Sequence, residues 1–111
     1  MSLTSTVHAS GHFHVKPAQW TSHHCGIDGR TIRFNVAVSG ELDARGFVID
    51  VRDVHEYFRQ KYVLGKGQIL SCEMIAQEAI EHFRKVGHKV NGASADIQAT
   101  KKGYATCQWK A

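Results

Sequence analysis

The chain has 111 residues, 42% of them hydrophobic, and a formal net charge of +4. This length and composition predict one compact globular domain over residues 1–111, with residues 1–5 as a loose N-terminus. No apolar run approaches the roughly 20 residues of a membrane-spanning helix, and the N-terminus lacks the basic-then-apolar pattern of a secretory signal. Three widely separated cysteines argue against a disulfide framework. We therefore expect a cytoplasmic protein without a membrane partner.

The charge pattern gives little support for nucleic-acid binding. Lysines and arginines are scattered along the sequence, whereas a nucleic-acid groove needs basic residues gathered on one face and interleaved with aromatics. The net positive charge by itself supplies only a weak attraction for phosphates. We expect a soluble surface with a mild basic bias and no nucleic-acid partner.

The first predicted element is a strand over residues 6–15. Apolar and polar residues alternate there with the period of a half-buried strand. The apolar face holds Val7, Ala9, Gly11, Phe13 and Val15, and the polar face holds His8, Ser10, His12 and His14. Pro17 ends the strand because proline cannot donate to a sheet ladder. Residues 16–29 show no sustained period and are predicted to be a connecting loop.

A second strand follows at residues 31–38 and leads into a helix. Its buried face is formed by Ile32, Phe34, Val36 and Val38. After Gly40, residues 43–46 are of the types that form turns, and the apolar residues 47–49 indicate a short strand. Asp50 stands where a helix N-cap belongs, because its carboxylate can accept the free N–H groups of the next turn. The helix then has one apolar stripe, made of Val51, Val54, Phe58 and Tyr62.

The C-terminal half predicts a second helix and two closing strands. Residues 65–67, Gly-Lys-Gly, interrupt the chain, and Ser71 is a candidate N-cap for a helix that ends near Gly87. The apolar stripe of this helix is Ile75, Ala79, Ile80 and Phe83. Strands are predicted over residues 95–100 and 104–109, joined by a hairpin turn. The predicted order of elements is ββααββ.

Several segments resemble one enzyme family. Residues 40–54, GELDARGFVIDVRDV, are similar to the G-x-(L/V)-D-x-x-G-(M/W)-(V/I)-x-D-F-x-x-L segment of the 6-pyruvoyl-tetrahydropterin synthase family, which includes the 6-carboxytetrahydropterin synthases. Residues 24–26 resemble the family's cysteine segment, residues 71–76 its P-T-x-E-N-(I/L)-A helix start, and residues 95–104 its last two strands. The resemblance implies the α+β tunnelling fold, or T-fold, in which a ββααββ subunit forms a four-stranded antiparallel sheet with two helices on one face.

The same resemblance implies self-association. In the family, three subunits close into a twelve-stranded barrel and two such trimers stack. A four-stranded sheet by itself leaves exposed edge strands, which invite pairing with another chain. We therefore expect a trimer or a hexamer of this chain.

The metal site of the family is altered in this sequence. Family members bind zinc through one histidine on or just after the first strand and two more in an H-G-H motif, and the position of that motif reads Asp28-Gly29-Arg30 here. A guanidinium has no free lone pair for a metal, so no metal or other cofactor is expected. Eight histidines leave one alternative open, a rearranged zinc site. The candidate ligands of that site are His12, His14, His23 and His24.

The catalytic residues implied by the resemblance are also incomplete. Cys25 corresponds to the family's catalytic cysteine, which is assisted by an aspartate and a histidine in the loop between the helices. Residues 57–71 contain neither aspartate nor histidine, and a thiol nucleophile needs a base together with a group that orients it. Cys25 therefore lacks its partners. The other cysteines, Cys72 and Cys107, are predicted to be core residues.

The residues that would bind a pterin are partly replaced. The glutamate that anchors the pterin in the family is Ala99 here, followed by a retained Thr100, and Gln98 is expected on the opposite sheet face. Glu73 is retained, although its place in the first turn of a helix also explains it.

Asp28 and Arg30 remain candidates for ligand binding. They either form an ion pair in the former metal site or lie in a solvated turn, where such a pair contributes ~0–1 kcal/mol. In a walled pocket Arg30 would favour an anion, and the resemblance also leaves a pterin-like ligand open. The sequence thus predicts a synthase-like scaffold with a non-catalytic binding or assembly role. The alternative is an active lyase or hydrolase on a pterin or purine-like compound, using Cys25 and a rearranged metal site.

Overall fold

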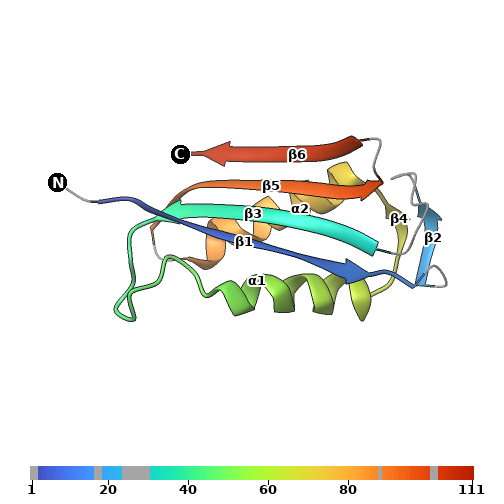
Figure 1. Cartoon of the computed structure of the whole chain (residues 1–111), viewed down its shortest axis with the longest axis horizontal. Coiled ribbons are helices and arrows are strands. Elements are labelled where there is room, and N and C mark those ends of the chain that lie inside the picture. Colours follow the sequence, from blue (N-terminus) through green and yellow to red (C-terminus); the bar gives the residue numbers. More distant parts are fainter. Residues whose placement is uncertain (1–2, 17–18, 24–30, 88, 101–102) are drawn as a thin grey trace.

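The computed structural model describes residues 3–16, 19–23, 31–87, 89–100 and 103–111. Its elements in chain order are β1 (Ser5–His14), β2 (Trp20–His23), β3 (Thr31–Gly40), α1 (Val51–Phe58), the π-helix η2 (Arg59–Val63), β4 (Gly67–Leu70), α2 (Cys72–Val86), β5 (Val90–Thr100) and β6 (Gly103–Lys110). The main sheet has the strand order β1-β3-β5-β6 with every neighbouring pair antiparallel. Both helices lie on one side of it (Figure 1). The predicted α+β architecture and the order of its main elements are confirmed.

The alternation along β1 and β3 divides the main sheet into a buried face and an open one. In β3 the side chains of Ile32, Phe34, Val36 and Val38 are buried, whereas Arg33 and Asn35 between them are exposed. Ala9 and Phe13 of β1 are buried in the same way, and the polar residues between them are exposed. These faces agree with the predicted ones. The helices cover only the apolar face.

Aromatic rings form the contact between the sheet and α1. The ring centroids of Phe34 and Phe58 lie 4.3 Å apart, and those of Phe13 and Phe58 lie 5.4 Å apart, both pairs stacked. Tyr62 stacks on Phe13 at 5.6 Å from the helical turn that follows α1. Phe58 and Tyr62 are each 1% exposed, so both rings leave water almost completely on folding. Such burial of apolar area is the main source of folding free energy.

Both helices begin at the predicted capping residues. The Asp50 carboxylate accepts a hydrogen bond from the Arg52 backbone N–H at 2.9 Å, and the Ser71 hydroxyl accepts one from the Met74 N–H at 3.1 Å. Val51 is 38% exposed, so the buried stripe of α1 starts one turn later than predicted, at Val54. The predicted stripe of α2 is buried in full.

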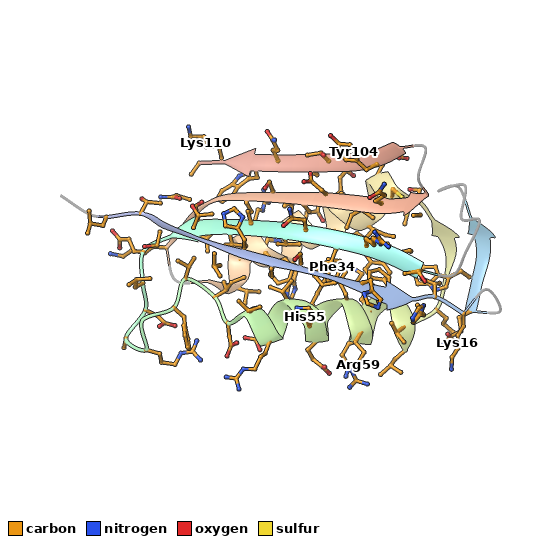
Figure 2. The ribbon with its side chains drawn as sticks, in the orientation of Figure 1. Lys16, Phe34, His55, Arg59, Tyr104 and Lys110 are labelled. Carbon is orange, nitrogen blue, oxygen red and sulfur yellow. The ribbon has the colours of Figure 1, made fainter. Side chains whose placement is uncertain are left out.

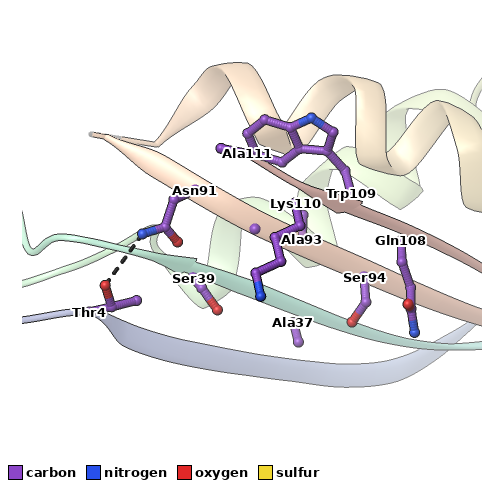
Figure 3. A pocket seen from close by; sticks show the side chains of 11 residues that line it. Thr4, Ala37, Ser39, Asn91, Ala93, Ser94, Gln108, Trp109, Lys110 and Ala111 are labelled. Atoms are coloured by element: carbon purple, nitrogen blue, oxygen red, sulfur yellow. Dashed lines mark hydrogen bonds between the residues drawn. The ribbon is translucent and has the colours of Figure 1, made fainter.

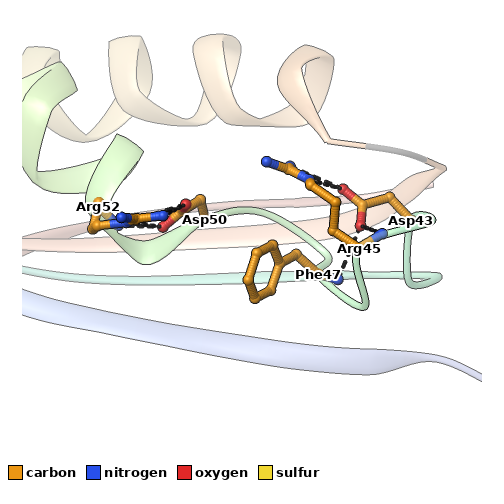
Figure 4. Close-up of polar contacts among 5 residues, drawn as sticks. All are labelled: Asp43, Arg45, Phe47, Asp50 and Arg52. Atoms are coloured by element: carbon orange, nitrogen blue, oxygen red, sulfur yellow. Dashed lines mark hydrogen bonds and ion pairs between the residues drawn. The ribbon is translucent and has the colours of Figure 1, made fainter.

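The predicted strand over residues 47–49 is wrong. This stretch contains a bend, because the N–H groups of the turn before it donate hydrogen bonds to the Asp43 side chain in place of a strand ladder (Figure 4). Asp43 Oδ1 accepts the backbone N–H groups of Arg45 and Phe47 at 2.9 and 3.0 Å, and Gly46 adopts a positive φ of 88°. Val48 and Ile49 are buried without belonging to a sheet. Their apolar character reflects burial, which periodicity cannot distinguish from a short strand.

The predicted loop at residues 16–29 contains a strand. β2 pairs in parallel with β4, and Trp20 is the register partner of Gly67. A Cβ atom at Gly67 would lie 2.6 Å from the Trp20 ring, so the glycine is needed for this contact. The Trp20 indole N–H donates to the Tyr62 carbonyl at 3.3 Å. Each strand has only four residues, too few for a recognisable period.

The strand predicted at residues 95–100 begins five residues earlier, at Val90. Its first half, with Gly92, Ala93 and Ser94, lacks the large apolar residues that mark a strand. Pairing with β3, in which Ala37 faces Ser94 and Ser39 faces Gly92, nevertheless places it in the sheet. β6 starts at Gly103, and the preceding part of the predicted hairpin turn lies outside the described residues.

We expect Phe58→Ala to reduce the free energy of unfolding by about 3–5 kcal/mol, because it removes the ring that stacks on both Phe13 and Phe34. Denaturant titration measures this change. Tyr104→Ala is the matched control, since Tyr104 is 71% exposed, and it should have little effect. Equal losses in the two variants would show that the stack does not hold α1 to the sheet.

The Asp50 cap predicts a pH effect on stability. Hydrogen bonds from the Arg52 guanidinium and backbone lower the pKa of Asp50 from 3.8 to about 2. The stabilisation is therefore complete above the unfolded pKa and is lost as pH falls through the folded one. In Asp50→Asn, which keeps a capping oxygen, melting temperatures should approach the wild-type values between about pH 5 and pH 2. A difference between the two proteins that does not change with pH would contradict this.

Candidate binding face of the sheet

Four of the nine predicted site residues lie outside the part of the chain that the structure describes. Cys25, Asp28, Arg30 and His24 belong to the undescribed segment 24–30. His23 closes β2. The roles assigned to these residues stay predictions.

The retained residues near the predicted pterin site fall on different elements. Glu73 is exposed in the first turn of α2, where a carboxylate faces the positive end of the helix dipole. Thr100 ends β5. Ala99 packs against the core, whereas Gln98 lines a hollow on the open face, so the predicted alternation is confirmed. The residue predicted to stand at the family's anchor position therefore has its methyl group on the core side.

His12 and His14 lie exposed on the open face of β1. Their ring centroids are 5.6 Å apart, and the His14 Nδ1 atom is 2.9 Å from the Thr31 hydroxyl oxygen. The register partner of His12 is Arg33, whose positive charge disfavours a cation beside it. Within the described ranges, no three His, Cys, Asp or Glu side chains are grouped to hold a metal ion.

The open face carries a polar hollow of about 280 Å³ near one end. It is lined by Arg33, Phe34, Asn35, Asp96, Gln98 and Tyr104. The strand register creates it, because Arg33 lies opposite Gln98 and Asn35 lies opposite Asp96. Sequence reasoning identified the faces of β1 and β3 and set Gln98 opposite Ala99, but it could not show which polar residues of different strands become neighbours.

The side chains of this hollow offer both hydrogen-bond donors and acceptors. Arg33 belongs to none of the ion pairs found among the described residues, so its guanidinium is available to a ligand. Asp96 Oδ1 accepts a hydrogen bond from the Thr106 hydroxyl at 2.7 Å, which holds the carboxylate on the open face. Tyr104, at one end of β6, adds an exposed aromatic ring (Figure 2). This set of groups suits a planar polar molecule that donates and accepts hydrogen bonds.

A second polar cluster lies between the helices, on the other side of the sheet. The Glu78 carboxylate accepts a hydrogen bond from the Tyr62 hydroxyl at 3.1 Å and pairs with the Lys61 ammonium at 2.6 Å. Burial raises the pKa of Tyr62 far above its ordinary value and also raises the pKa of Tyr57. Both phenols therefore stay protonated at neutral pH, which suits packing better than acid–base chemistry.

His82 completes the inter-helix cluster. Its ring stacks on Tyr57 with centroids 4.4 Å apart. Burial, with a smaller contribution from the Lys61 charge, lowers the pKa of His82. The Tyr57 hydroxyl oxygen is buried and has no hydrogen-bond partner among the described residues. The cluster ties η2 to α2.

No helix in the described part of the chain is long and apolar enough to cross a membrane.

Comparisons with known proteins identify the fold. No protein-family model and no curated protein sequence match the chain. Among solved structures, a catalytic-residue mutant of Plasmodium vivax 6-pyruvoyltetrahydropterin synthase matches with a TM-score of 0.66 and 11% identity, over 99% of this chain and 100% of that one. The chain has the fold of 6-pyruvoyltetrahydropterin synthase. The fold implied by the sequence resemblance is thus confirmed.

Two further synthases show the same similarity. The Plasmodium falciparum enzyme matches with a TM-score of 0.58 and 12% identity, over 96% of this chain and 99% of that one. The Caenorhabditis elegans enzyme matches with a TM-score of 0.50 and 14% identity, over 99% and 97%. At such identities the similarity shows the fold of the chain alone.

Proposed function

We propose that this chain is a non-catalytic binding or assembly protein built on the fold of 6-pyruvoyltetrahydropterin synthase. The observation that supports assembly most directly is the pair of edge strands in the main sheet. β1 and β6 stand at its two ends, and within the described residues no strand pairs with the outer edge of either. Exposed edges of this kind favour pairing with another chain.

The directions of the strands favour closure into a ring. Four antiparallel strands place β1 and β6 in opposite directions. β6 of one subunit can therefore add to β1 of the next and continue the antiparallel alternation. Repetition of this head-to-tail contact gives a closed ring, with the helices outside and the polar face inside. We propose a trimer of this kind, or a hexamer of two trimers.

A binding role is supported by the residues that differ from the synthase pattern. Residues 59–71, which connect α1 to α2, contain no aspartate or histidine. Ala99 offers no carboxylate to a pterin. The open face nevertheless keeps a charged and hydrogen-bonding hollow at Arg33 and Asp96. We propose that a small polar molecule, anionic or pterin-like, binds without being converted.

Assembly is tested first by molar mass. Light scattering at micromolar concentration should give three or six times the mass of the 12.4 kDa chain. Proline is then placed singly at Ala105 and at Thr106 of β6. Consecutive N–H groups of a strand point to opposite sides. One substitution therefore removes an N–H group that bonds to β5, and the other removes an N–H group from the free edge of the sheet.

The edge-directed proline should keep the circular dichroism of the folded chain and abolish the oligomer. The proline directed toward β5 should instead lower the free energy of unfolding, because it removes a hydrogen bond between β5 and β6. A monomeric wild-type protein would contradict the proposed assembly. An oligomer that survives both substitutions would exclude β6 as the contact.

Absence of catalysis is tested with dihydroneopterin triphosphate. We expect no conversion, with or without added zinc, because the base, the metal motif and the anchor of the family are each altered. Protein purified without chelator should also contain no stoichiometric zinc. Turnover that disappears in Cys25→Ala, or bound zinc that is lost on replacing His14 or His23, would favour the active lyase or hydrolase.

A further inference from the structure

A second hollow lies on the open face, near the end of the sheet opposite Tyr104. It has a volume of about 720 Å³ and is lined by Thr4, Ala37, Ser39, Asn91, Gly92, Ala93, Ser94, Gln108, Trp109, Lys110 and Ala111. Tyr104 and Lys110 mark the two ends of β6, so this hollow is separate from the one at Arg33 (Figure 2). Neither the comparisons nor the family resemblance assigns it a role.

The strand register explains the shape of this hollow. Ala37 and Ser39 of β3 lie opposite Ser94 and Gly92 of β5, so four small residues meet on the open face. Longer side chains border them on both sides. On the β1 side, Thr6 lies opposite Ser39 and His8 lies opposite Ala37. On the β6 side, Gln108 lies opposite Ser94 and Lys110 lies opposite Gly92.

Lys110 extends over the floor of the hollow. Its register partner is Gly92, which has no side chain to oppose it. Figure 3 shows the Lys110 side chain lying across β5 with its ammonium group directed toward β3. Lys110 belongs to none of the ion pairs among the described residues. The cation is therefore available to a ligand in the hollow.

The other polar groups of the lining complement this charge. They are hydroxyl and amide groups on Thr4, Ser39, Asn91, Ser94 and Gln108, and the described lining contains no aspartate or glutamate. Three of them already have partners, since Asn91 Nδ2 donates to the Thr4 hydroxyl at 3.3 Å and the Ser39 hydroxyl lies 2.6 Å from that of Thr6. No hydrogen bond engages the side chains of Ser94 and Gln108 in the described structure, which leaves both as donors beside the ammonium.

We propose that this hollow binds a small oxyanion, a phosphate or carboxylate group, with Lys110 as its cation and Ser94 and Gln108 as hydrogen-bond donors. Hydrogen bonds to an ionised oxygen are stronger than neutral ones, and no aspartate or glutamate side chain lines the hollow to compete for the ammonium. All these residues belong to one chain, so the site does not depend on assembly. It also differs from the anion pocket predicted at Arg30, which lies outside the described residues.

Binding is measured by isothermal titration calorimetry with inorganic phosphate and, separately, with succinate, at constant ionic strength. The wild-type protein should bind at least one of them saturably, and the two arms distinguish a phosphate group from a carboxylate. Lys110→Gln should weaken binding by about tenfold or more, because it removes a charge-assisted hydrogen bond. Lys85→Gln on α2 removes the same charge from the helix layer and should leave the affinity unchanged.

A second variant tests the hollow without a change of charge. Ala37→Leu places a larger side chain on the floor, on the face away from the core, and should also abolish binding while circular dichroism stays that of the wild type. Arg30→Gln distinguishes the two candidate anion sites and should leave binding intact. The proposal is overturned if the wild-type protein shows no saturable binding, or if Lys110→Gln and Ala37→Leu bind as the wild type does. Loss of binding in Arg30→Gln alone would place the anion at the other site.

Discussion

The fold depends on the side-chain alternation of β3, the strand that pairs with both β1 and β5. Its buried residues pack against α1 and the core, and Phe34 lies 4.3 Å from Phe58 between ring centroids. A shift of one residue in its register would turn this apolar set to the open face and bury Arg33 and Asn35. Burying an unpaired guanidinium is prohibitively costly. The same constraint therefore fixes the core and the composition of the open face.

The face of the sheet that the helices leave uncovered carries two polar hollows. It presents one hollow around Arg33 and Asp96, and another around Lys110 and a floor of small residues. The side chains of the first include a cation, a carboxylate and amides, whereas those of the second include a cation, hydroxyls and amides but no aspartate or glutamate. Two hollows of different charge on one sheet face follow from the residues that the register brings together. In a ring closed through β1 and β6, both would face the interior.

The helix layer, in contrast, is organised for packing. Its polar cluster at Glu78, Lys61 and the two tyrosines is internally paired, apart from the buried Tyr57 hydroxyl. Raised tyrosine pKa values keep these phenols neutral. The cluster joins η2 to α2, while the Asp50 and Ser71 caps fix where the two helices start. Among the described residues, the polar groups available to a ligand therefore lie on the other side of the sheet.

The sequence by itself determined the features that depend on neighbours along the chain. Alternation predicted the buried faces of β1 and β3, and short-range capping chemistry predicted the helix starts at Asp50 and Ser71, because these interactions span only a few residues. Only the tertiary structure decided the pairing of β2 with β4, the bend at residues 47–49 and the early start of β5. Both hollows belong to this second group. They arise from the register between strands that are distant in sequence, which no local pattern specifies.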